Sequence, residues 1–272
     1  MNDLSGIGKS YRTKLSSILE KNFGVITAKL VSETLDASTQ EAGRLLSRWC
    51  KNGWLVRIKR GAYIPVPLES TSTNVVTEEP FLVAELIYRP GYIAGFSAVK
   101  HWDFSEQIIE SVTYFTCKKV KIRNPSHGGI KFKLKTVTSK KVFGLKTLWI
   151  GNQKVKISDP TKTIIDLLDD PKLVGGITIV CDFFSEYLNS EYCNIELLIK
   201  YAQEMNNKTI FKRLGLLFET KFEASEEILS LILKNISTGL SEFDPTIPSE
   251  YIITRWRLKT SRYWKMEYDR KK

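Results

Sequence analysis

The residues of this chain that could catalyse a reaction are few and far apart. Asp159, Asp182 and the Glu219-Thr-Lys221 stretch could form the Asp…Glu-x-Lys set of a nuclease, in which carboxylates hold Mg²⁺ beside a lysine. Such a set arises easily by chance in a chain with 30 acidic residues. Asp159 precedes a proline where a helical pattern begins, which is typical of a helix N-cap, and Glu219 lies at the end of a helical pattern.

Nucleophilic catalysis and metal binding have equally little support. Only two histidines exist. His101 lies in a Lys-His-Trp helical context and His127 in a Ser-His-Gly-Gly turn, and neither context provides a local nucleophile partner. The four cysteines lack Cys-x-x-Cys spacing, and no glycine-rich phosphate-binding loop occurs. The sequence therefore predicts a protein that is not an enzyme and holds no metal or cofactor.

Length and composition restrict the class of protein further. With 272 residues, 42% hydrophobic and 26% charged, the chain resembles an ordinary globular protein with one or two cores. It contains no apolar run of the roughly 18 residues that a membrane span needs, and no signal peptide. We therefore expect no membrane partner and a reduced, cytoplasmic location.

The net charge of +11 is distributed in blocks. It is +6 over residues 1–68, −5 over 69–110, +12 over 111–158, −7 over 159–249 and +5 over 250–272. Residues 111–158 contain twelve lysines and arginines and no acidic residue. This layout predicts basic and acidic faces, and it favours an anionic partner for at least one basic face.

Residues 1–68 have the pattern of three short helices and a hairpin. Apolar residues at helical spacing predict helices at about 11–22 and 27–35, and Ser38-x-x-Glu41 is a capping box that begins a third helix, which ends near Asn52-Gly53. Strands follow at 54–58 and 62–65, joined through Lys59-Arg60-Gly61. Three helices followed by a β-hairpin are typical of a winged helix-turn-helix DNA-binding domain.

In that fold the third helix enters the major groove and the hairpin contacts the adjacent backbone. Glutamine suits adenine and arginine suits guanine, and cations at the hairpin tip suit phosphates. A small interaction domain with a solvated charged face is the simpler alternative, but cations lie on both elements that would contact DNA. The candidate DNA-binding residues are Thr39, Gln40, Arg44, Ser47, Arg48, Lys51, Arg57, Lys59 and Arg60.

The stretch Pro65–Asn74 is polar, contains two prolines and lacks apolar periodicity. It predicts a linker, placed at 69–78, to a larger domain at 79–272. Within that domain we expect a helix at 81–88, an antiparallel sheet at about 111–158 and helices from 159 to about 240. The fold class is therefore α+β. The expected strands are 112–117, 119–123, 130–136, 142–143, 147–150 and 155–157. The expected later helices are about 159–168, 177–189, 194–206, 208–219 and 225–238, before a strand at 251–259 and a basic tail.

Alternation within this sheet predicts one packed face and one face of cations. The cationic residues are Lys119, Lys121, Arg123, Lys131, Lys133 and Lys135. Lysines on exposed strands also discourage strand addition, which would explain two or three of them. The remainder favour a surface that binds nucleic acid or an acidic protein.

Four stretches, in this order, carry a resemblance to a known family. They are "RWCKNGWLVRIKRGAYIPV", "GYIAGFSAVKHW", "ISDPTKTIIDLLDDPKLVGGI" and "KRLGLLFE". Together they resemble AbiEi-type antitoxins of bacterial type IV toxin–antitoxin (abortive infection) systems, over residues 8–220. The first stretch is shared by many regulators, whereas the Ser-Asp-Pro…Gly-Gly stretch is more specific.

The resemblance implies a two-domain protein. Its N-terminal winged helix would bind inverted repeats in double-stranded DNA of its own promoter and repress transcription. Its second domain would neutralise a cognate nucleotidyltransferase-like toxin, typically without a stable complex. The alternative is a free-standing winged-helix regulator whose second domain binds a ligand or another protein. The cationic sheet face is not a family motif.

Overall fold

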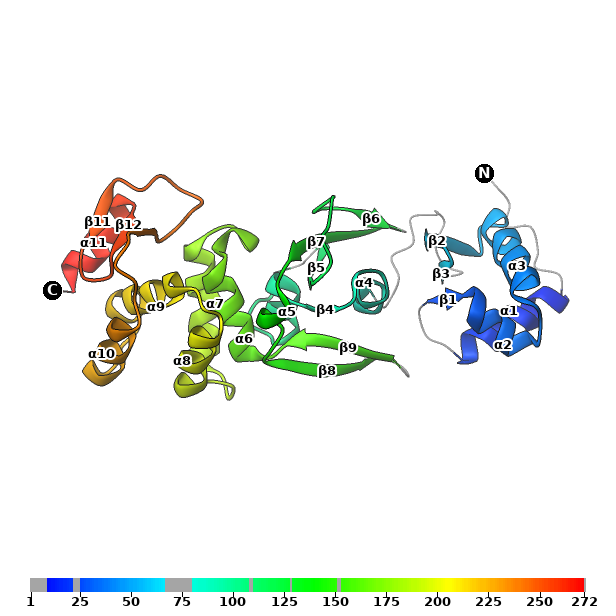
Figure 1. Ribbon diagram of the computed structural model, residues 1–272, viewed down its shortest axis with the longest axis horizontal. Coiled ribbons are helices and arrows are strands. Elements are labelled where there is room, and N and C mark those ends of the chain that lie inside the picture. The colour runs from blue at the N-terminus through cyan, green and yellow to red at the C-terminus, as the bar shows by residue number, and fades with distance from the viewer. Residues whose placement is uncertain are drawn as a thin grey trace. The chain divides into compact units, whose positions relative to one another are not determined.

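The structure is a computed structural model, and it has an α+β fold (Figure 1). It describes residues 9–21, 25–66, 80–107, 110–127, 129–150 and 153–271. Contacts divide the chain into two compact units. The first comprises Met1–Ile93, Glu110–Thr136 and Thr147–Lys156, and the second comprises Ala94–Ile109, Val137–Lys146 and Ile157–Lys272. The predicted linker at 69–78 lies outside the described residues, so the domain boundaries at 68 and 79 remain predictions.

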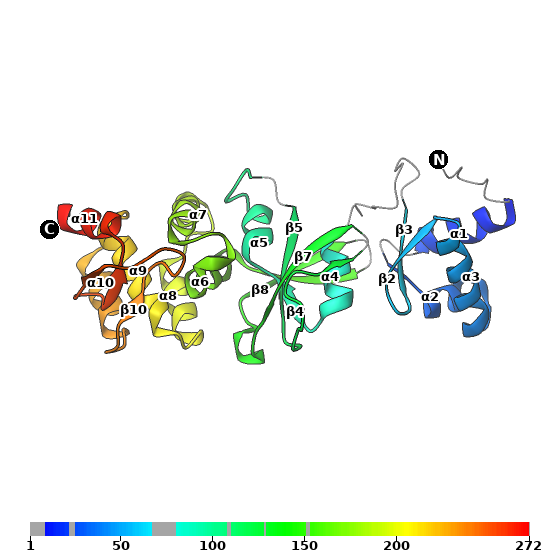
Figure 2. The same cartoon turned by 90° about the horizontal axis from the view of Figure 1, so that it is seen from above.

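The N-terminal elements contain the predicted helices and hairpin. They are α1 (Lys9–Lys21), β1 (Ile26–Thr27), α2 (Ala28–Leu35), α3 (Thr39–Lys51), β2 (Leu55–Lys59) and β3 (Ala62–Pro65) (Figure 1), and Figure 2 shows the same helices and the β2–β3 hairpin from above. The hydroxyl of Thr27 caps α2 by accepting a hydrogen bond from the Leu30 amide at 3.2 Å. β1 was not predicted from the sequence; it pairs with β3 in a three-stranded sheet of order β1-β3-β2. Apolar side chains from α1, α2, α3 and the strands form one core, which includes Ile18, Val31, Leu46, Trp49 and Tyr63.

A six-stranded sheet follows α4 (Pro80–Tyr88), and its order is β6-β7-β5-β4-β9-β8. Its strands are β4 (Gly91–Ile93), β5 (Ser111–Thr116), β6 (Ser126–His127), β7 (Ile130–Thr136), β8 (Leu145–Ile150) and β9 (Gln153–Ser158). The predicted antiparallel sheet is a mixed one: β4 with β5 and β6 with β7 pair antiparallel, whereas β5 and β7 are parallel. After β5 the chain crosses to the outer side of β7, forms β6 there and turns back, which gives β7 the direction of β5.

Two predicted strands are absent from the described part of this region. Residues 119–123 form bends between β5 and β6. Ile122, an apolar residue of the alternating pattern, is 66% exposed, so the pattern does not form a packed face here. Residues 142–143 follow a short 3₁₀ helix, η1 (Ser139–Lys141). The alternation in β7 is confirmed, since Ile130, Phe132 and Leu134 are buried between lysines.

The second unit is mainly helical. It contains α5 (Gly95–His101), α6 (Pro160–Asp169), η2 (Pro171–Leu173), α7 (Ile177–Asn189), α8 (Ile195–Glu204), α9 (Lys208–Thr220) and α10 (Glu226–Lys234). The predicted helices are therefore confirmed, although α8 and α10 are shorter than expected. α6 contacts α5, α7, α8 and α9 (Figure 1), and every side chain from Pro160 to Leu168 is buried.

The C-terminal segment differs from the prediction of one strand and a basic tail. It forms β11 (Tyr251–Ile253) and β12 (Leu258–Thr260), which pair with β10 (Ser241–Glu242) in the order β10-β12-β11. A helix, α11 (Arg262–Arg270), then packs on α9 and β11. Trp264 and Tyr268 lie four residues apart and are both buried, so this basic stretch has the apolar face that a packed helix requires.

No helix in the described part of the chain is both long and apolar enough to span a membrane.

Replacing Gly215 by alanine is predicted to destabilise the second unit. A Cβ at Gly215 in α9 would lie 2.2 Å from a ring carbon of the buried Trp256. Overpacking of this kind costs about 1–3 kcal/mol or more. Gly239→Ala is the control, because a Cβ there meets nothing within 4 Å. Urea unfolding should show a lower midpoint for Gly215→Ala alone; equal midpoints for both variants would contradict the close packing of α9 on Trp256.

Candidate nucleic-acid interface

The start of α3 is fixed by a complete capping box. Ser38 is the N-cap; its hydroxyl accepts a hydrogen bond from the Glu41 amide at 3.2 Å, and Glu41 Oε2 accepts from the Ser38 amide at 2.9 Å. The Ser38 hydroxyl also donates to Glu41 Oε2 at 2.7 Å. This hydrogen bond and the one from the Ser38 amide lower the pKa of Glu41. The sequence prediction of this box is confirmed, and Glu41 therefore has a structural role at the helix start.

The buried and exposed sides of α3 are clearly separated. Ala42, Leu46 and Trp49 are buried in the N-terminal core. Gly43, Leu45 and Cys50 are half-buried, and the remaining positions of the helix are exposed. The exposed positions include every candidate DNA-binding residue predicted on this helix: Thr39, Gln40, Arg44, Ser47, Arg48 and Lys51. Gln40, Arg44, Ser47 and Lys51 are spaced so that their side chains lie along one face of the helix.

The β2–β3 hairpin adds cations next to this helix in the sequence. Arg57 and Arg60 are exposed, and Gly61 has a φ of 78°, which a side chain would disfavour. The pairing register shifts between Arg57 and Lys59, as in a β-bulge. The backbone of Lys59 ends β2, but its side chain lies outside the described residues. Arg44 and Arg60, on which the DNA-binding hypothesis depends, both lie at the surface.

Arg48 differs from the other cations of α3. Its Nη1 donates a hydrogen bond to the Tyr11 hydroxyl of α1, and its guanidinium lies 5.6 Å from the centre of the Tyr11 ring. Tyr11 thus holds Arg48 and connects α1 to α3. The sequence predicted only that Tyr11 begins an amphipathic helix, and no local pattern could have indicated a contact across 37 positions.

The start of α3 also borders a depression of about 380 Å³ with mixed charge. Asp36 and Glu41 lie there beside Lys14, Arg44 and Arg48. The two carboxylates reduce the positive potential around Arg44. Consequently the N-terminal turn of α3 is less cationic than its last turn, where Arg48 and Lys51 lie.

The second group of candidate cations, in the six-stranded sheet, is not one continuous face. Lys131 forms an exposed ion pair with Glu110 at 2.7 Å, just outside the acid-free stretch. Lys135 lies 5.2 Å from the centre of the Phe115 ring, and Lys133 is half-buried. Lys119, Lys121 and Arg123 are exposed, but they lie in the connection between β5 and β6 instead of on a strand.

Three residues of the conceivable nuclease set have structural partners, whereas Asp182 is exposed on α7. The Asp159 carboxylate caps α6 by accepting from the Lys162 amide at 2.7 Å, and it accepts from the Tyr201 hydroxyl at 2.9 Å. Glu219 accepts hydrogen bonds from Arg255 and from the indole of Trp256. Lys221 pairs with Glu267. In the described ranges, no group of three His, Cys, Asp or Glu residues could hold a metal ion.

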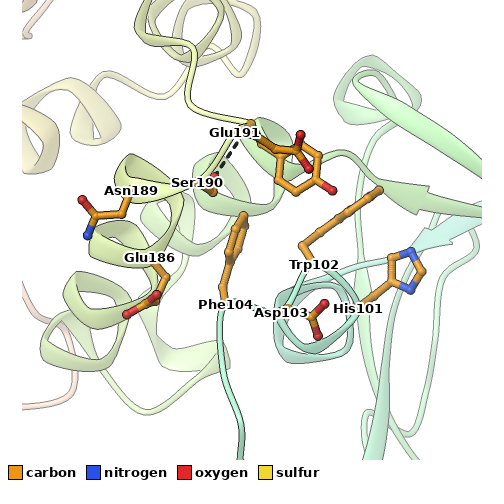
Figure 3. A pocket seen from close by; sticks show the side chains of 9 residues that line it. His101, Trp102, Asp103, Phe104, Glu186, Asn189, Ser190 and Glu191 are labelled. Carbon is orange, nitrogen blue, oxygen red and sulfur yellow. Dashed lines mark hydrogen bonds between the residues drawn. The ribbon is translucent and has the colours of Figure 1, made fainter.

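A cavity of about 570 Å³ lies between α5 and the end of α7. Figure 3 shows the side chains that line it. Carboxylates of Asp103, Glu186 and Glu191 line it, together with Trp102 and Tyr192. Its acidic lining repels phosphate, so this cavity is not part of an interface for nucleic acid. His101 at its rim packs edge-on against Trp102 with 4.7 Å between ring centres, and burial lowers the pKa of His101.

No family model matches the chain, and no curated protein matches it. Among solved structures, the chain is similar to the crystal structure of the RV2827C protein from Mycobacterium tuberculosis. The TM-score is 0.63 over 92% of this chain and 90% of that chain. At 13% sequence identity this likeness shows a shared fold and carries no activity from one protein to the other.

Replacing Ser38 by alanine is predicted to lower stability by about 1 kcal/mol, because α3 loses its N-cap. Hydrogen bonds from Ser38 hold the pKa of Glu41 below its usual value. In the wild type, their contribution to the free energy of unfolding is therefore present at neutral pH and is lost as the pH falls below about 4. The loss in the variant should therefore be larger at pH 7 than at pH 3. Ser47→Ala, an exposed mid-helix change, is the control. Equal effects of both changes in thermal unfolding would contradict the capping role.

Proposed function

We propose that residues 1–68 form a winged helix-turn-helix domain that binds double-stranded DNA. The observation that carries this proposal is the division of α3 into a buried side and an exposed polar, cationic side. Arg57 and Arg60 on the following hairpin add exposed cations. With α3 in the major groove, a hairpin in this position contacts the adjacent phosphate backbone.

The exposed residues divide into two roles. Gln40 and Arg44 face base edges, where each bidentate pair discriminates by about 1–3 kcal/mol. Lys51, Arg57 and Arg60 contact phosphates and provide affinity without sequence preference. Arg48 orients α3 through Tyr11 and contacts a phosphate at most, because its guanidinium already has a partner.

For the whole chain we propose a transcriptional autorepressor with antitoxin activity. In this proposal it binds inverted repeats in its own promoter, and its second domain neutralises a nucleotidyltransferase-like toxin without a stable complex. The support is the resemblance to AbiEi-type antitoxins. Two of its stretches form α6 and α9, whose polar residues are largely buried in the second unit. These stretches therefore support a similar second domain, but they do not indicate where a toxin is recognised.

Arg44→Ala is predicted to weaken binding to the promoter about tenfold or more, with a smaller effect on random duplexes, because Arg44 reads a base. Arg60→Ala should weaken both by similar factors and reduce the slope of log K against log salt by about 1, because it removes one phosphate contact. Fluorescence anisotropy with labelled duplexes at several salt concentrations measures both effects. Lys29→Ala, at an exposed residue of α2 that pairs with Glu33, is the matched control. Equal losses for Arg44 and Arg60 on both duplexes would contradict the assignment of a base reader.

Co-expression is predicted to restore growth in cells that produce a nucleotidyltransferase-like toxin encoded beside this gene. Rescue should persist in the Arg44→Ala variant under an unrelated promoter, because the second domain carries this activity. Colony counts with and without the antitoxin measure rescue. If the full chain never relieves toxicity, the antitoxin proposal is wrong and the free-standing regulator is favoured.

A further inference from the structure

Trp149 is an exposed aromatic residue that neither the core nor the proposed duplex interface uses. It lies in β8, where 64% of its surface is accessible. β8 is the last strand in the sheet order, and among the described residues no further strand pairs with its outer edge. A tryptophan contributes most when its ring is buried, and exposed aromatic rings often mark a binding surface.

Lysines of β9 flank this ring. Lys154 Nζ lies 4.8 Å from the centre of the Trp149 ring, and Lys156 Nζ donates a hydrogen bond to the Thr147 hydroxyl at 2.6 Å. Trp149 contacts Lys154 and Thr147 contacts Lys156, which is the order of pairing expected for antiparallel strands. The two residues of each strand are two positions apart, so all four side chains share one face. The cation–π contact orients the indole and places a positive charge beside it.

The surrounding charge favours an anionic ligand. Residues 111–158 contain no acidic residue. Glu85 of α4 is close enough to Lys156 for the lysine to lower the pKa of this carboxyl, against a larger opposite effect of burial. Lys156 is therefore partly balanced, whereas Lys154 adjoins the exposed ring. A flat aromatic surface beside ammonium groups suits a ligand with stackable rings and phosphates.

We propose that Trp149, Lys154 and Lys156 form a binding site for unpaired nucleotides. A base stacks on the indole, and the lysines neutralise the phosphates on either side of it. Duplex DNA does not fit this chemistry, because its bases are stacked on each other and present only their edges. This site is therefore separate from the interface on α3 and does not depend on it.

The competing occupant of β8 is an acidic peptide that adds a strand to its free edge. That mode uses backbone hydrogen bonds, and an extended acidic strand would tolerate loss of the indole. Stacking, in contrast, requires an aromatic ring at position 149. The two occupants are thus distinguished by replacing Trp149 with alanine and with phenylalanine.

The test is titration of the full chain with fluorescein-labelled oligouridine and oligothymidine about ten nucleotides long. Trp149→Ala should weaken binding about tenfold, as loss of one stacked base does, whereas Trp149→Phe should keep most of the affinity. Lys154→Ala should weaken binding and lower its salt dependence. Ile122→Ala is the matched control, since Ile122 is equally exposed in the same acid-free stretch, and it should bind normally.

Several outcomes would overturn the proposal. The first is that the wild type binds neither oligonucleotide at low salt. The second is that Trp149→Ala and Ile122→Ala lose affinity for the oligonucleotides equally. The third is that the protein binds a polyglutamate-containing peptide in place of oligonucleotides. Tighter binding of oligouridine than of oligothymidine would assign the site to RNA, and the reverse to single-stranded DNA. Unchanged binding of duplex promoter DNA by Trp149→Ala would confirm that the two sites are separate, whereas an equal loss on both ligands would contradict this.

Discussion

The second unit depends on the burial of charged residues in α6. Lys162 and Asp166 are 0% and 1% exposed, and removing such ions from water costs several kcal/mol each unless they are paired. They form an ion pair one helical turn apart, and Lys162 Nζ lies 4.9 Å from the centre of the Phe143 ring. Removing one partner would leave the other charge buried without this ion pair, at a cost of about 3–5 kcal/mol. The pair therefore keeps two charges of α6 compensated in the interior of the second unit.

The C-terminal end of the same helix imposes a second requirement, because its last carbonyl groups lack partners within the helix. Arg213 of α9 donates to the carbonyls of Leu168 at 2.7 Å, Phe243 at 2.9 Å and Glu242 at 3.0 Å. One guanidinium thus joins α6 to α9 and to the small C-terminal sheet. Burial lowers the pKa of Arg213 to about 10, so it remains charged at neutral pH and retains these hydrogen bonds.

Local signals in the sequence predicted the features that are local in the structure. The capping box of Ser38 and Glu41, the Asp159 cap and the lysine alternation in β7 each follow from neighbouring residues. The parallel pairing of β5 and β7 does not, because it depends on where the intervening chain crosses the sheet. The contact of Tyr11 with Arg48 likewise depends on how two helices pack. The candidate residues of α3 were predictable because amphipathic periodicity alone decides which side of a helix is exposed.

The +11 net charge is therefore a poor guide to function until each cation is located. Lys162 and Arg213 are basic residues whose charge is used inside the fold, and Lys221 pairs with Glu267. None of these can contact a phosphate without losing its internal partner. Arg44 and Arg60 contribute equally to the count, yet they are exposed on elements that a duplex can reach. A lysine or arginine supports binding of an anionic ligand only where its charged group is exposed to water. There the ligand replaces counterions, and no existing hydrogen bond is broken.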